Sequence, residues 1–145
     1  MNPLLMMLAF VLLTWSFIQC DTIIDSSSFT GDFNFTADSS PYVITVSHSI
    51  SGLLTIEPNV QVKMYQGVGL TVGSMLADGT EAPIEFIPFD LGGTWGGLTV
   101  NTATIMGVTI TGVEGSCAIT FDMGITIQNS TIAESVGSGI CGPAY

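Results

Sequence analysis

The chain has 145 residues, 47% of them hydrophobic, and a formal net charge of -11 at pH 7. This length and composition suit one domain with a real core and argue against disorder. Lys63 is the one basic residue besides a histidine, so no basic patch can neutralise phosphates, which excludes binding to nucleic acid or to an anionic lipid surface. The abundance of Gly, Thr, Ile and Val predicts an all-β fold.

Residues 1–20, MNPLLMMLAFVLLTWSFIQC, are predicted to be a signal peptide. The apolar run from Pro3 to Ile18 is shorter than the roughly 20 residues of a transmembrane helix and has the length of a secretory core segment. We expect cleavage near Cys20, which leaves a secreted mature chain without a membrane-inserted segment. Because the usual basic residue is missing before the run, an uncleaved anchor is the alternative.

The mature chain then keeps two cysteines, Cys117 and Cys141. An even number of cysteines in an oxidising compartment favours a disulfide between them. Two free or separately buried thiols, or partners in a missing portion of the chain, are the alternatives.

Two tripeptides, Asn34-Phe35-Thr36 and Asn129-Ser130-Thr131, fit the pattern for glycosylation of asparagine. The pattern matters only if the chain enters the secretory pathway, and it also occurs by chance.

Residues 21–41 are polar and rich in Ser and Asp, with Phe29, Phe33 and Phe35 two or four positions apart. This spacing predicts a strand-like lead-in or N-terminal cap over the first layer of a core. The alternation sharpens from Tyr42, and Glu57-Pro58-Asn59 then marks a corner, since proline cannot continue a central strand.

From residue 42 to residue 145 we expect short strands separated by Gly, Asn, Ser or Asp, and no amphipathic helix. Such strands, without regular hairpin turns, favour a coiled β-solenoid over a sandwich. A repeat of roughly 20 to 25 residues would give about five turns.

A four-residue phrase of glycine, an apolar residue, threonine and a β-branched residue recurs along this region. In a solenoid, similar phrases recur because each turn buries its apolar side chains against the same positions of adjacent turns. The uneven spacing of the phrases predicts that some of them mark different corners. The residues that we assign to this structural repeat are Gly69, Leu70, Val72, Trp95, Gly97, Leu98, Gly107, Ile110, Gly124 and Ile127.

Five short segments follow one another between residues 54 and 98: Leu54-Thr55-Ile56-Glu57-Pro58-Asn59, Gly69-Leu70-Thr71-Val72, Ala77-Asp78-Gly79-Thr80, Pro83-Ile84-Glu85-Phe86 and Trp95-Gly96-Gly97-Leu98. In this order and spacing they resemble the extracellular right-handed parallel β-helix modules with pectate-lyase-like repeats, as in bacterial surface proteins and the bark beetle cell-surface proteins of animal tricellular junctions. The match is good over residues 42–100 and looser over 101–140. Asn59 replaces the usual glycine, and asparagine also tolerates a left-handed backbone. The resemblance implies a right-handed single-stranded β-helix in an extracellular setting, and it does not imply a reaction.

Parallel β-helices also carry glycan-cleaving enzymes, for which hydrolysis requires two facing carboxylates. The closest group of acids is Asp78, Glu81 and Glu85, which fall around a loop and are expected to be solvated surface charges. Elimination would require a strong cation, and Lys63 is expected to point outward from a strand. We therefore assign no catalytic residue.

His48 lies in the polar stretch SHSIS and is expected to be a solvated loop residue. It has no second histidine for a zinc site or a catalytic triad. The glycine run around Trp95 has neither the aspartate of a calcium-binding repeat nor the lysine of a phosphate loop, and it predicts a tight turn that places Trp95 over the end of a core layer. We expect no metal and no cofactor.

The chain ends at GSGICGPAY without an obvious polar cap. Solenoids need caps for solubility, so we expect either a truncated piece of a longer junctional or receptor-like protein at the cell surface, or end-to-end self-association of a small secreted protein. The function that we expect is a structural or adhesive module whose partners are extracellular proteins or glycans. The alternative is a β-helix that binds or cleaves carbohydrate.

Overall fold

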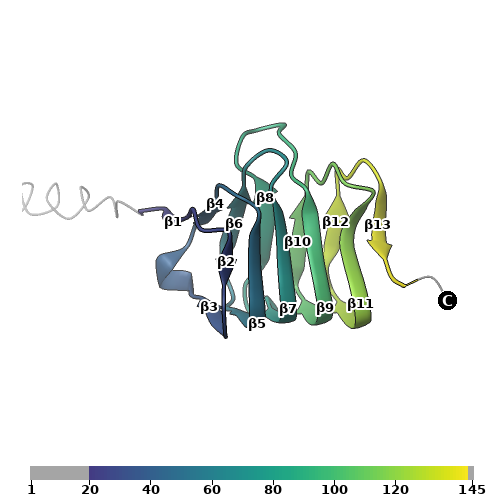
Figure 1. Ribbon diagram of the computed structural model, residues 1–145, viewed down its shortest axis with the longest axis horizontal. Coiled ribbons are helices and arrows are strands. Elements are labelled where there is room, and N and C mark those ends of the chain that lie inside the picture. Colours follow the sequence, from purple (N-terminus) through teal and green to yellow (C-terminus); the bar gives the residue numbers. More distant parts are fainter. Residues whose placement is uncertain (1–19, 144–145) are drawn as a thin grey trace, which may run out of the picture.

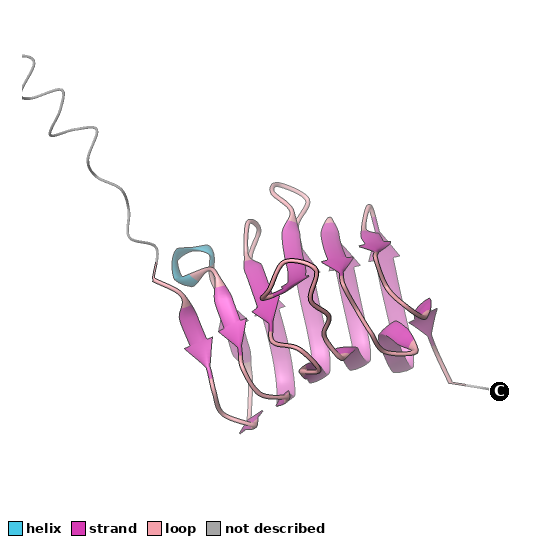
Figure 2. Cartoon of the chain, turned by 90° about the horizontal axis from the view of Figure 1, so that it is seen from above, coloured by secondary structure: helices cyan, strands magenta, loops and turns pink. Residues whose placement is uncertain are grey.

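The computed structural model describes residues 20–143, so the predicted signal peptide lies outside the described residues except for Cys20. Parallel strands and the turns between them make up nearly all of this region (Figure 1). The strands are β1 (Thr22–Ile24), β2 (Ser28–Phe29), β3 (Phe33–Phe35), β4 (Tyr42–Ile44), β5 (His48–Ile56), β6 (Gln61–Met64), β7 (Gly69–Asp78), β8 (Ile84–Pro88), β9 (Gly97–Met106), β10 (Val108–Thr111), β11 (Cys117–Gln128), β12 (Thr131–Ala133) and β13 (Ser138–Cys141). One short 3-10 helix, η1 (Ala37–Ser39), lies near the N-terminal end (Figure 2).

The strands form two parallel sheets that run along the length of the molecule. The short sheet has the order β1-β4-β6-β8-β10-β12, and the long sheet has the order β13-β11-β9-β7-β5-β2, with β3 also paired to β5. Each coil from β4–β5 to β10–β11 therefore contributes one short strand and one long strand. The chain forms a right-handed β-helix of about five turns, which confirms the expected fold.

The coils stack in register with the period that the sequence predicted. In the short sheet, neighbouring strands place Thr22, Tyr42, Val62, Phe86, Ile110 and Ile132 opposite one another. These positions are about 20 to 24 residues apart, within the range typical of solenoid repeats. The sequence 22–35 already forms the first coil, because β1 pairs with β4 and both β2 and β3 pair with β5.

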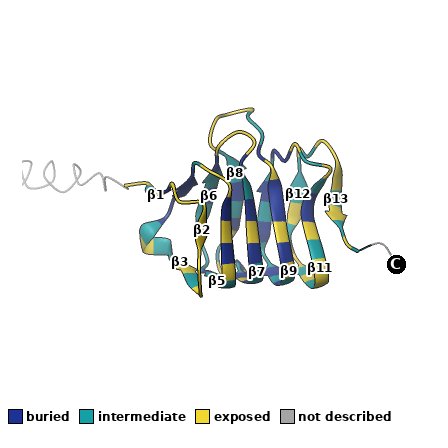
Figure 3. Ribbon diagram, in the orientation of Figure 1, coloured by how far each residue is buried: buried dark blue, intermediate teal, exposed yellow. Residues whose placement is uncertain are grey.

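Rows of aliphatic side chains stack inside the coils. Leu70 of β7, Leu98 of β9 and Ile119 of β11 form one such row, and each is 1% exposed. Because side chains alternate across a strand, every second residue enters the core while its neighbours face solvent, as the stripes in Figure 3 show. The core is thus a column shared by all coils rather than a single cluster.

The long strands differ from the expectation of strands only a few residues long. The strands β5, β7, β9 and β11 have 9, 10, 10 and 12 residues. The register shifts near the middle of two of these strands, between Ile50 and Leu53 in β5 and between Phe121 and Gly124 in β11. We call the residues before these positions, and the residues in register with them in β7 and β9, the first arm of each long strand, and those after them the second arm. The strand β2 pairs with the first arm of β5, and β3 pairs with the second.

The recurring phrase marks three different faces of the β-helix. Gly69 and Gly97 stand in register at the start of β7 and β9. Gly107 lies between β9 and β10, whereas Gly124 lies in the second arm of β11, opposite Thr102 of β9. This arrangement explains the uneven spacing of the phrase along the sequence.

Two corner residues illustrate how the turns are made. Asn59 has a φ of 66°, the left-handed conformation that asparagine tolerates, so the proline corner forms as predicted. Trp95 is wholly buried, and its indole Nε1 donates a hydrogen bond to the Thr111 carbonyl at 2.7 Å. Its ring lies nearly parallel to that of Phe86 of the fourth coil, with the ring centroids 6.2 Å apart, so Trp95 packs as part of the buried core.

The last coil covers only part of the coil before it. The strand β13 pairs with β11 at Cys117, Ile119 and Thr120, and no strand pairs with the second arm of β11 on that side within residues 20–143. Ile125 and Ile127 of this arm are consequently only half-buried, although they pack against the core.

Candidate functional site

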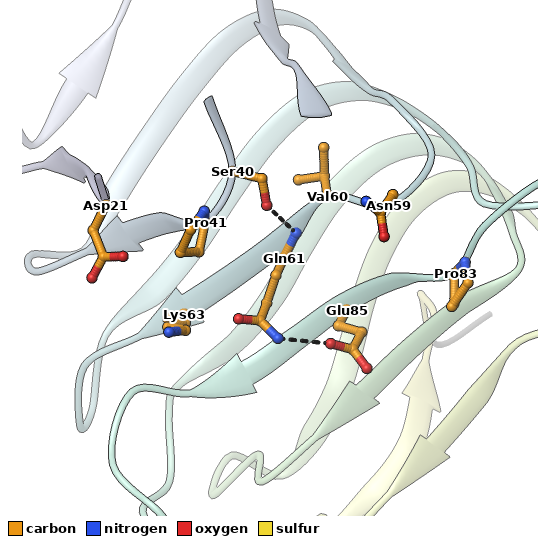
Figure 4. A pocket seen from close by; sticks show the side chains of 9 residues that line it. All are labelled: Asp21, Ser40, Pro41, Asn59, Val60, Gln61, Lys63, Pro83 and Glu85. Atoms are coloured by element: carbon orange, nitrogen blue, oxygen red, sulfur yellow. Dashed lines mark hydrogen bonds between the residues drawn. The ribbon is translucent and has the colours of Figure 1, made fainter. Parts of the chain in front are cut away.

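A polar groove of about 440 Å³ lies on the outer face of the short sheet (Figure 4). It spans four coils, because its lining residues come from the residue before β1, from the turn before β4, and from β6 and β8 with the turns that precede them. The lining residues are Asp21, Ser40, Pro41, Asn59, Val60, Gln61, Lys63, Pro83 and Glu85.

Strand alternation places the polar side chains of the groove. In β6, Val62 and Met64 are fully buried, so Gln61 and Lys63 must project from the opposite face. Glu85 of β8 stands in register with Gln61, and it faces outward because Ile84 and Phe86 are buried. The prediction that Lys63 points outward is confirmed by this geometry.

Hydrogen bonds fix the centre of the groove. The Gln61 side chain donates from Nε2 to Glu85 Oε2 at 2.8 Å, and the Gln61 backbone N–H donates to Ser40 Oγ at 2.9 Å. Both bonds join neighbouring coils. They hold the Gln61 amide and the Glu85 carboxylate in fixed orientations, which prepares them to bind polar groups of a ligand.

Lys63 supplies the positive charge of the groove, and Asp21 and Glu85 supply negative charges. Within residues 20–143, Lys63 forms no ion pair, and its neighbours in the register are the apolar Val43 and Ile87. The groove thus offers an ammonium group, an amide and carboxylates on one surface. Such a mixture of donors and acceptors can bind hydroxyl-rich molecules.

The three acids that the sequence grouped have different environments. Asp78 ends β7, and its Oδ1 accepts hydrogen bonds from the Thr80 hydroxyl at 2.7 Å and from the Thr80 N–H at 3.1 Å. These bonds, the side-chain bond first, lower the pKa of the Asp78 carboxyl. Glu85 lies in the groove and binds Gln61, whereas Glu81 is exposed in the turn before β8.

His48 is a correction to the sequence analysis. It is the first residue of β5 and is only 4% exposed, so the expectation of a solvated loop residue is wrong. Its ring nitrogen Nδ1 hydrogen-bonds the Ser26 carbonyl oxygen of the preceding coil. The sequence did not indicate that His48 is buried, because its neighbours on both sides are serines. These serines face outward, whereas the imidazole faces inward.

The disulfide between Cys117 and Cys141 is present, with a Cα–Cα distance of 5.8 Å. It joins β11 to β13 and so links the last two coils. Cys20 is a free, exposed cysteine. Asn34 of β3 and Asn129, in the turn after β11, are both exposed, as a glycosylation site requires.

Among residues 20–143, no group of three or more His, Cys, Asp or Glu side chains is arranged to hold a metal ion. The same residues include no helix with the length and apolar character that a membrane crossing requires.

Comparisons with protein-family models, with curated proteins and with solved structures find no match to this chain.

Proposed function

We propose that the protein is an extracellular β-helix module with a structural and adhesive role. The observation that carries this proposal is the disulfide between Cys117 and Cys141. Disulfides form and persist in oxidising compartments such as the secretory pathway and the cell exterior, and they are rare in the cytosol. The predicted signal peptide and the exposed Asn34 and Asn129 support the same location.

The β-helix suits a structural role because its shape depends on stacking alone. Every coil contributes inward side chains to the same column, so the outer faces are free to vary without loss of the core. The partners that we propose are extracellular proteins or glycans that bind these outer faces. The resemblance to extracellular modules with pectate-lyase-like repeats supports the same role.

Secretion is tested first, by expressing the full sequence in cultured animal cells. We expect the mature chain in the medium, with the disulfide intact and with a gel mobility that glycosidase treatment increases. If both sites are used, the variants Asn34→Gln and Asn129→Gln should each remove one glycan, and each should therefore reduce the change in gel mobility on glycosidase treatment. Retention of the chain in the cytosol with reduced cysteines would overturn the extracellular location.

Adhesion is tested with the secreted protein coupled to fluorescent beads. We expect the beads to bind to epithelial cells or to one another, above the level of beads coated with an unrelated protein of similar negative charge. That control matters because the net charge of -11 alone could promote binding to basic surfaces. Equal binding by both kinds of bead would count against an adhesive role.

Carbohydrate binding is the second candidate, and the polar groove favours it. Gln61, Lys63 and Glu85 present donors and acceptors side by side, which suits the hydroxyl groups of a sugar. A glycan array probed with the secreted protein should give hits that the variant Gln61→Ala weakens, while Glu81→Gln, outside the groove, leaves them unchanged. Release of reducing sugar from any bound glycan would extend the candidate to cleavage.

A further inference from the structure

A second, smaller pocket lies beyond the polar groove, where the turn after β8 bends over the outer face of the short sheet. Its volume is about 220 Å³, below the roughly 300 Å³ at which pockets for whole small molecules begin. It therefore fits one side chain of a partner better than a free small molecule. Its lining is Ile87, Pro88, Asp90, Leu91, Gly92, Gly93, Thr111 and Glu134.

The two kinds of lining residue have distinct chemistry. Ile87, Pro88 and Leu91 provide apolar surface, whereas Asp90 and Glu134 provide carboxylates from two different turns of the chain. Both acids are exposed, and within residues 20–143 neither carboxylate takes part in a hydrogen bond or ion pair. Lys63 stands next to Ile87 in the register but forms no ion pair with either acid.

The turn that carries Asp90 is held by a specific backbone geometry. The Gly93 N–H donates a hydrogen bond to the Asp90 carbonyl at 2.9 Å, and Gly92 has a φ of 73°. A positive φ at this position is typical of a type II turn. The turn presents Leu91 at its tip, where the side chain is fully exposed to solvent, and the loop 89–96 rises above the neighbouring coils in Figure 1.

Exposed aromatic surface adjoins this turn along the chain. Tyr65 and Phe89 are 39% and 40% exposed, and their ring centroids lie 4.6 Å apart. Phe89 precedes the turn by one residue, and Leu91 lies at its tip, so this exposed aromatic pair lies at the base of the same turn. Exposed apolar side chains that are grouped with a pocket are typical of protein-binding surfaces.

We propose that this corner binds a protein partner through an arginine side chain flanked by apolar residues. The aliphatic part of the arginine would pack on Ile87, Pro88 and Leu91, and its guanidinium group would lie between Asp90 and Glu134. Charge complementarity supports this occupant, because the chain carries a net charge of -11 and two of its acids, neither in an ion pair, line the pocket. The inference deepens the proposed adhesive role by assigning one surface to it.

The test uses N-acetyl-arginine methylamide as a probe of the pocket, with its uncharged isostere N-acetyl-citrulline methylamide as the control ligand. Backbone amide resonances of the mature secreted protein would be followed by NMR during titration. We expect saturable shifts confined to the loop 89–96, Ile87, Thr111 and Glu134, with millimolar affinity. The citrulline compound should bind at least about tenfold more weakly, because charge-assisted bonds to carboxylates are lost.

Variants of the acids provide the second arm of the test. The double variant Asp90→Asn and Glu134→Gln keeps side-chain size and should weaken arginine binding by about tenfold or more. The matched control Glu81→Gln removes an exposed acid outside the pocket and should leave binding unchanged. Dispersed amide resonances in each variant would show that the fold is retained.

Three results would overturn the inference: no saturable shift with the arginine compound, equal binding of the citrulline compound, or full binding by the double variant. None of these results bears on secretion or on bead adhesion, which report on the whole surface. Failure of the pocket and failure of the proposed function are therefore distinguishable. Conversely, the pocket can bind arginine even if the beads do not adhere to the cells tested.

Discussion

His48 of β5 stands directly opposite Leu70 of β7, in the position that Leu98 and Ile119 occupy in the next two coils. A histidine thus takes a place that the other coils fill with an aliphatic side chain. The exchange is tolerated because the ring nitrogen Nδ1 hydrogen-bonds the Ser26 carbonyl, so the buried polar atom has a partner. His48 is therefore part of the core near the N-terminal end of the β-helix.

Replacing His48 tests this assignment. We expect His48→Leu to change the free energy of unfolding by less than about 1.5 kcal/mol. Leucine fills the same row, and the carbonyl oxygen of the exposed Ser26 can accept a hydrogen bond from water instead. His48→Ala should cost about 2 to 4 kcal/mol, because it leaves a cavity between coils. Chemical denaturation monitored by circular dichroism would compare the two variants. A solvated histidine would instead make both substitutions nearly neutral.

The corners and the repeat could be predicted because they depend on local residue types. The proline corner before Asn59 and the in-register phrases at Gly69 and Gly97 each follow from a few adjacent residues. The register shifts within β5 and β11 could not be predicted in this way. Gly73 of β7 lies opposite the shift in β5, and its added Cβ would approach the Ser51 carbonyl oxygen to 2.4 Å, so the preceding coil, and not the local sequence, requires the glycine.

The groove could not be predicted for a related reason. Asp21, Asn59 and Glu85 belong to different coils and share a surface only once the register between coils is known. Sequence proximity grouped Asp78, Glu81 and Glu85 instead, and the β-helix gives these acids different surroundings. In a solenoid, neighbours in space are commonly about one repeat apart in sequence.

Two glycines of the recurring phrase are expected to respond differently to alanine. Gly107 has a φ of 60°, and an added Cβ would lie 2.4 Å from the Gly79 carbonyl oxygen. Gly107→Ala should therefore destabilise the fold by roughly 2 kcal/mol or more, through backbone strain and the clash. A Cβ added at Gly124 would have no other heavy atom within 4 Å, so Gly124→Ala should change stability by less than about 1 kcal/mol.

Thermal unfolding of the two alanine variants side by side would check this difference. Equal melting temperatures would contradict the contact between Gly79 and Gly107, and with it the packing of the third coil against the fourth. The comparison is matched because both glycines precede an apolar residue, a threonine and an isoleucine.

The disulfide is expected to stabilise the last coil more than the rest of the molecule. Cys117 and Cys141 are 24 residues apart, and closing a loop of this length contributes about 3 kcal/mol in the chain-entropy model. In the double variant Cys117→Ser and Cys141→Ser, we expect faster hydrogen exchange in β13 and in the first arm of β11. The strands β5 and β7, which β9 separates from β11 in the long sheet, should keep their protection.

Mass spectrometry after alkylation gives the direct control for the disulfide. Without reductant, Cys117 and Cys141 should resist alkylation. Alkylation of both residues in the unreduced secreted protein would show that the bond does not form. In that case the observation that carries the extracellular proposal would also be lost.

The Asp78 carboxyl should titrate below the ordinary aspartate range, because its charged form accepts hydrogen bonds from Thr80. A carboxyl whose pKa is lower in the folded state than in the unfolded state adds stability at neutral pH, and that stability is lost as the pH falls through the folded-state pKa. Thr80→Val removes the hydroxyl and should raise the pKa of Asp78, whereas Thr80→Ser should keep it low. Carbon-13 NMR of the side-chain carboxyl would measure the Asp78 pKa in the wild type and in both variants.

The stability difference between the wild type and Thr80→Val should be greatest near neutral pH and should shrink below about pH 4, near the usual aspartate pKa. An Asp78 pKa that is the same in the wild type and in Thr80→Val would show that the hydroxyl does not bind the carboxylate in solution.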